Sequence, residues 1–206
     1  MDSAKNLGVI LDSELSFKNQ INKVVKSCFF TLKRLASIRH YLEQDHLKLL
    51  VCSHIFSKID YCNALYYKLD STCLKRLQLV QNSAARLITN KRIVTNLDNI
   101  FTALHWLKVR ERIVYKILLT IHKCIHSCAP NSLSNLVKYA DSARRMNLRV
   151  TKVKSKHGER SFSHAGPKLW NCLPEHVKNE NDTDCFKKLL KSYLMVKGDE
   201  YNRRCI

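Results

Sequence analysis

Apolar residues recur at spacings of three and four along several long stretches of this sequence, and this period constrains the fold more than any other feature. Between residues 17 and 40 the apolar positions fall within an arc of roughly 140° at the helical period. They are Ile21, Val24, Val25, Cys28, Phe29, Leu32, Leu35 and Ala36. With only four glycines and three prolines in 206 residues, there is little turn chemistry to divide a many-stranded sheet. We therefore predict a mainly α fold.

The same period predicts the other elements. Further helices are expected over about 45–61, over 71–90 with Ser71 as its cap, around 100–106, over 109–127, from Asn131 to Leu136 and over 182–194. Upstream, the apolar run Leu7–Asp12 reads as a strand that leads into the first helix, with Ser16 placed to cap that helix.

The charge of the chain points to a polyanionic partner. Lys and Arg number 36 against 17 Asp and Glu, which gives a net charge of +19, too large an imbalance to serve solubility alone. Nucleic acid and an anionic membrane surface would both satisfy this charge. No apolar run reaches the roughly 18 residues that a membrane span needs, and residues 1–15 lack a signal-peptide core. We therefore expect RNA or DNA as the partner and no membrane.

The cysteines indicate the compartment. Nine cysteines are spread singly along helix-like segments, without the tight even spacing of a disulfide framework. They read as reduced, mostly buried thiols, and we expect an intracellular protein, nuclear or cytoplasmic or both.

Basic side chains lie opposite the apolar stripes, and a dense basic segment follows at 144–160. That segment holds seven Lys or Arg and one acidic residue, and its alternation over 148–154 indicates an exposed strand or extended arm. A solvated helix face and a mobile loop without a partner are the alternatives. The candidate nucleic-acid-binding residues are Lys23, Lys26, Lys33, Arg34, Lys75, Arg76, Arg86, Arg144, Arg145, Arg149, Lys152, Lys154, Lys156 and Arg160.

The sequence gives little support for a catalytic site or a metal site. His122, Cys124, His126 and Cys128 are four soft ligands in one stretch. On a helix, however, the two histidines share a face that lies about 200° from the cysteines, so one zinc ion could not gather all four. Carboxylates are sparse and form no pair that would hold two magnesium ions for nucleotidyl transfer. We expect no catalytic residues, no metal and no cofactor.

Several ordered blocks resemble one known family. Leu7-Gly-Val-Ile-Leu-Asp12 with Leu15-Ser-Phe17 resembles the strand and helix start just after the palm of jockey-like, LINE-type non-LTR retrotransposon reverse transcriptases. Leu74 to Ile88, with its Gln-Asn and Arg86, resembles the thumb helix of that family, and Leu104 to Lys116 resembles its next block. The remaining matches resemble the family's C-terminal signature: Ala129-Pro130, Arg160-Ser-Phe162, Gly166-Pro-Lys-Leu-Trp-Asn-Cys-Leu-Pro174 and Phe186 to Lys191.

The resemblance covers roughly residues 7–194 and implies an organisation. It predicts a strand remnant of the palm edge at 1–16, a thumb-like three-helix region at 17–93, a helical extension at 94–140, and a basic arm with the C-terminal motifs at 141–206. The resemblance also implies that the protein binds template RNA or target DNA, and it makes the palm-containing remainder of a parent polymerase a further candidate partner. The family's catalytic aspartates precede the segment that begins here, so we expect a non-catalytic fragment.

Two other functions stay open at this point. The chain could be the translated relic of a truncated element, without activity. It could instead be a protein-interaction module whose apolar stripe, once turned toward a palm, binds a partner protein.

Overall fold

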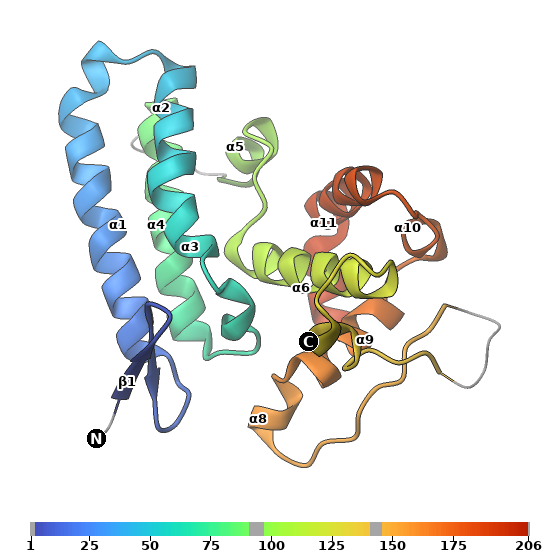
Figure 1. Ribbon diagram of the computed structural model, residues 1–206. Helices are drawn as coiled ribbons and strands as arrows, with labels where there is room; N and C mark the ends of the chain where they lie inside the picture. The colour runs from blue at the N-terminus through green and yellow to red at the C-terminus, as the bar shows by residue number, and fades with distance from the viewer. Residues whose placement is uncertain (1–2, 91–96, 141–145, 206) are drawn as a thin grey trace. The chain divides into compact units, whose positions relative to one another are not determined.

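The computed structural model describes residues 3–90, 97–140 and 146–205, and it is mainly helical (Figure 1). The predicted fold class is thereby confirmed. The chain divides into two compact units, 1–110 and 111–206. Each unit is built around its own set of buried apolar side chains.

A short hairpin opens the first unit. Strands β1 (Ser3–Asn6) and β2 (Val9–Asp12) pair antiparallel, with Ser3 opposite Asp12. Leu7 and Gly8 join them with φ values of 44° and 84°, and positive φ at both central residues suits the twist of a tight hairpin. The prediction of a strand from Leu7 was therefore wrong at its start, because Leu7 and Gly8 form the turn. β1 has no apolar alternation that could have revealed it.

The first long helix, α1 (Lys18–Ile38), is anchored by an aspartate. Asp12 accepts hydrogen bonds from the backbone N–H of Ser16 and of Phe17, both at 2.7 Å. Burial raises the pKa of Asp12, but these hydrogen bonds outweigh it and leave the pKa below its ordinary value. The predicted cap, Ser16, contributes only a long 3.5 Å contact to the N–H of Lys18, so Asp12 holds the start of this helix.

Three helical arms with alternating direction form the body of the first unit (Figure 1). α1 ends in the 3₁₀ turn η1 (Arg39–Tyr41), and the chain returns through α2 (Gln44–Val51), the π-helical turn η2 (Cys52–Phe56) and α3 (Ser57–Asp60). After the 3₁₀ turn η3 (Asn63–Tyr66), α4 (Ser71–Thr89) runs parallel to α1. The predicted helices at 45–61 and 71–90 are confirmed. The predicted cap Ser71 was wrong by one residue, since the Asp70 side chain accepts from the N–H of Thr72.

The apolar stripes meet at the centre of this bundle, as their period predicts. Among the most deeply buried apolar side chains are Ile21, Cys28, Leu47, Val51, Ile55, Ile59, Leu77, Val80 and Ala84. α5 (Leu97–Ala103) and the residues after it cover one end of the core. The Trp106 ring packs edge-on against Phe56 at 4.4 Å between centroids. The buried Gln81 amide donates to the Leu107 carbonyl at 2.7 Å, which fixes the chain leaving α5.

The second unit packs its helices around Trp170 and Phe186. Its elements are α6 (Val109–Ile125, which begins in the first unit), α7 (Asn131–Ser134), α8 (Lys156–Glu159), α9 (Phe162–Asn171), α10 (Glu175–Lys178) and α11 (Thr183–Cys205). The predicted helix at 109–127 is confirmed, and the terminal helix extends well beyond the predicted 194.

α9 was not expected, because Gly166 and Pro167 lie inside it and both residues weaken a helix interior. Packing explains the glycine: a Cβ added at Gly166 would lie 2.5 Å from Ile121 Cδ1 on α6. The close approach of α6 and α9 therefore requires a residue without a side chain, and the buried Leu169 and Trp170 compensate for the weak local preference.

Candidate nucleic-acid interface

The face of α1 that points away from the core carries four of the predicted cations. Lys23, Lys26, Lys33 and Arg34 are all exposed. At about 100° per residue they fall within roughly 60° of Phe30 around the helix axis. α1 contains no acidic residue, so no carboxylate within the helix neutralises this surface. We call these four cations the α1 cationic face.

The predicted cations of α4 lie beside that face only in part. The Arg76 guanidinium donates to the Asn22 side chain of α1, which places it at the seam between the two parallel helices. Lys75 is exposed. Arg86 is half-buried, and its Nε has no hydrogen-bond partner among the described residues. Arg76 is thus the α4 cation that the structure joins to α1.

In the second unit, residues 146–154 form an extended segment that is fixed along its backbone. Leu148 makes an isolated antiparallel bridge with Tyr139, and the Asn171 side chain both accepts from the Leu148 N–H and donates to its carbonyl, each at 2.8 Å. The Trp170 indole donates to the Met146 carbonyl at 2.9 Å, and His164 Nδ1 bonds the Thr151 carbonyl at 2.7 Å. Three side chains of α9 therefore hold the segment in place.

The cations of this segment point outward. Arg149, Lys152 and Lys154 are exposed, as is Lys156 at the start of α8, whereas Arg160 is half-buried where α8 meets α9. Arg144 and Arg145 lie outside the described residues. The prediction of an exposed, extended basic stretch agrees with the described part, 146–154, and we call Arg149, Lys152, Lys154 and Lys156 the basic segment.

Two residues near the α1 cationic face were missed by the sequence reading. Lys58 on α3 donates from Nζ to Ser27 Oγ at 2.9 Å and to Thr31 Oγ1 at 3.2 Å, which brings another cation against α1. Phe30 is 64% exposed at the centre of the face. Its place was readable from the spacing, since Lys26 and Arg34 each lie four residues from it.

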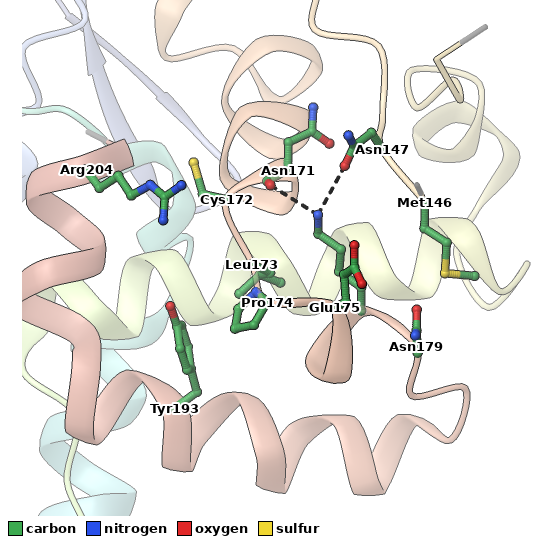
Figure 2. Close-up of a pocket in the computed structure, with 11 residues that line it drawn as sticks. Met146, Asn147, Asn171, Cys172, Leu173, Pro174, Glu175, Asn179, Tyr193 and Arg204 are labelled. Atoms are coloured by element: carbon green, nitrogen blue, oxygen red, sulfur yellow. Dashed lines mark hydrogen bonds between the residues drawn. The ribbon is translucent and has the colours of Figure 1, made fainter. Parts of the chain in front are cut away.

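A polar pocket of about 460 Å³ lies where the extended segment meets α9, α10 and α11 (Figure 2). Tyr193 and Arg204 reach toward it from α11. The buried Lys178 donates from Nζ to Asn147 Oδ1 and to the Asn171 carbonyl, both at 3.1 Å. The lining of amides, a phenol, two cations and the carboxylate of Glu175 favours polar groups that form hydrogen bonds over apolar ones. No motif or spacing in the sequence links the stretches that contribute its residues.

The stretch 122–128 serves packing in this structure. His122 is fully buried, stacks on Phe186 with 4.0 Å between ring centroids, and donates from Nε2 to the Glu180 carbonyl at 2.9 Å. The His126 ring lies 4.3 Å away on the same face, as helical geometry predicted. With Nε2 bonded to a carbonyl, the remaining ring nitrogen, Nδ1, is buried and has no hydrogen-bond partner among the described residues.

Burial lowers the pKa of His122, with a smaller contribution from the neighbouring His126, although the hydrogen bond to Glu180 opposes the shift. At pH values between the lowered pKa of the folded state and the ordinary value of 6.5, His122 is protonated in the unfolded chain but neutral in the folded chain. The free energy of unfolding should therefore fall as pH drops through this window and be at its full value above pH 6.5.

Urea unfolding of the wild type and of His122→Asn at neutral pH and at mildly acidic pH checks this. We expect the variant to be less stable at neutral pH but to lose less stability on acidification. Equal losses in the two proteins would show that His122 does not carry the pH dependence.

All nine cysteines are free thiols, but only Cys28, Cys73, Cys124 and Cys205 are buried, so the expectation of mostly buried thiols was wrong. Burial raises the pKa of Cys28 to about 11 and the pKa of Cys205 to about 12. These two thiols stay protonated at neutral pH, and protonated thiols are poor nucleophiles.

No family model, curated protein or solved structure matches this chain. Support for a function therefore comes from the chain's own sequence blocks, fold and cationic surfaces.

The described residues bear on two further kinds of site. They contain no group of three or more His, Cys, Asp and Glu side chains arranged to hold a metal ion. Among the helices formed by these residues, none combines the length and the apolar character required to cross a bilayer.

Proposed function

We propose that this chain binds the phosphate backbone of RNA or DNA without catalysing a reaction on it. In this proposal it is a non-catalytic C-terminal fragment of a retrotransposon RNA-directed DNA polymerase, the family that its sequence blocks resemble. Its role is to grip template RNA or target DNA through positive side chains on a helical scaffold.

The observation that carries the proposal is the α1 cationic face. Four exposed cations lie on one side of a helix that contains no acidic residue. On an ordinary solvated helix face, positive and negative side chains are interspersed and support each other at spacings of three and four. A face of one sign repels itself unless a polyanion neutralises it.

The basic segment gives independent support. Trp170, Asn171 and His164 of α9 hold the backbone at Met146, Leu148 and Thr151, so the main chain on either side of Arg149 would lose little conformational freedom on binding. A binding surface that is ordered beforehand loses less entropy when its ligand arrives. An extended chain with outward cations can follow a phosphate backbone.

A salt titration tests the proposal. The affinity of the purified chain for a fluorescent RNA or DNA should decline linearly on a log–log plot against salt, by about 0.7 per phosphate contact for single strands and 0.9 for a duplex. Engagement of the α1 cationic face alone would give a slope of roughly −3. Absent binding, or binding that salt does not weaken, would contradict the proposal and favour a relic or a protein-interaction module.

Primer extension tests the non-catalytic part. With a primed RNA template, deoxynucleotides and Mg²⁺ or Mn²⁺, the chain should give no extension, because nucleotidyl transfer needs carboxylates that hold two metal ions together. A retroviral reverse transcriptase serves as the positive control. Metal-dependent extension by the purified chain would overturn this part of the proposal.

A further inference from the structure

The aromatic ring of Phe30 lies in the middle of the α1 cationic face, on the side of the helix that is turned away from the core. Phe30 is 64% exposed, although its neighbours Val25, Cys28 and Leu32 turn into the core. Lys26 lies one turn before Phe30, and Lys33 and Arg34 lie one turn after it. The ring is therefore an apolar surface framed by cations.

The nearest cation extends this aromatic surface. The guanidinium carbon of Arg34 lies 6.0 Å from the centroid of the Phe30 ring, within reach of a cation–π interaction. Aromatic rings and arginine planes are the two side-chain groups on which nucleobases stack. The lysines around them supply the charge that attracts phosphates.

We propose that Phe30 is a base-stacking residue and that the α1 cationic face takes single-stranded nucleic acid. This rests on the proposed function and names the class of substrate for that same surface. In a duplex, the faces of each base are covered by neighbouring bases and cannot be reached by a ring on a helix surface. In an unpaired strand, a base can turn onto the ring while its phosphates contact Lys26 and Lys33.

Charge complementarity favours nucleic acid over a protein as the occupant. A partner for this face must be anionic over the length of α1 and must also present a flat apolar surface at its middle. Nucleotides combine a phosphate and a planar base in every unit. An acidic peptide supplies the charge without the planar groups, which makes poly-glutamate a suitable competing ligand.

The experiment measures binding of the full chain to a labelled single-stranded oligothymidylate and to a hairpin duplex with the same number of phosphates. Phe30→Ala should weaken binding of the single strand roughly tenfold and binding of the duplex by less than about twofold. The salt slope should be unchanged, because no charge is removed. Phe30→Trp should keep the single-strand affinity of the wild type, and the fluorescence of the new indole should be quenched by the stacked base.

Tyr41→Ala is the matched control, because Tyr41 is an exposed aromatic residue, at 87%, that lies in η1 beyond the face. If Phe30→Ala behaves like this control while the wild type keeps its salt-dependent binding, stacking is wrong and the proposed function stands. If the wild type binds neither nucleic acid, both fail. Equal weakening for strand and duplex, or poly-glutamate that binds as tightly and depends equally on Phe30, would also overturn the inference.

Discussion

Reversal of the α1 cationic face, with Lys23, Lys26, Lys33 and Arg34 all changed to Glu, should weaken nucleic-acid binding by roughly 30- to 700-fold at low salt. This range follows if each lost contact contributes about 0.5–1 kcal/mol. The log–log salt slope should become shallower by roughly 3, since about one phosphate contact is lost per cation. Fluorescence anisotropy over a range of salt concentrations measures both quantities.

Two comparison variants separate position from total charge. Reversal of the basic segment (Arg149, Lys152, Lys154 and Lys156) makes the same change in net charge on the second unit and should also flatten the slope. Reversal of Lys116, Lys188, Lys191 and Lys197, which are exposed but belong to neither surface, should leave most of the affinity. If all three variants lose affinity equally, only the overall charge matters and the two surfaces are not binding sites.

Trp170→Ala should destabilise the second unit by about 3–5 kcal/mol, the usual cost of removing a large buried aromatic side chain. Trp170 is 1% exposed, its ring lies 5.9 Å from Phe186 between centroids, and its indole N–H bonds the Met146 carbonyl. Because domains are stable by only about 5–15 kcal/mol, such a loss would remove a large part of the stability of this unit. Hydrogen exchange resolved by peptide can follow the second unit separately from the first.

Trp170→Phe is the control that keeps an aromatic ring but removes the hydrogen bond to Met146. We expect a smaller loss, about 1–2 kcal/mol from the unpaired carbonyl and a reduced ring, together with faster exchange in residues 146–154. If Trp170→Ala leaves exchange in α6, α9 and α11 unchanged, the ring is not a central part of this core.

Much of the helical fold follows from periodicity, and the failures have local causes. The stripe on α1 correctly placed Ile21, Leu32 and Leu35 inside, since period alone decides which face is buried. Phe29 and Ala36 were placed inside with them, yet both are exposed, because they lie at the edge of the arc. α9 was missed because Gly166 and Pro167 disfavour a helix locally, and only contacts with α6, distant in sequence, reverse that preference.

The sequence predicted which charged side chains of the candidate site are exposed, but not the contacts that arrange them in space. The sequence identified the exposed cations on α1 and in the basic segment, because lysine and arginine opposite an apolar stripe must face solvent. It could not show that Asn171 would hold Leu148 by both of its backbone groups. Nor could it assemble the polar pocket, whose residues are brought together only by the packing of α9, α10 and α11.

The π-helical turn η2 has a consequence for how this gene can change. Leu47, Val51, Ile55 and Ile59 are each at most 1% exposed, although a step of four residues drifts about 40° in a regular α-helix. The wider turn at Cys52–Phe56 offsets that drift and keeps the row aligned on the core. Deletion of one residue within this turn would convert it to a regular α-turn, and the row, then spaced by four, three and four residues, would still face the core. In-frame loss of one codon should therefore be tolerated better within this turn than within α1 or α4, where it would turn the apolar positions that follow by about 100°.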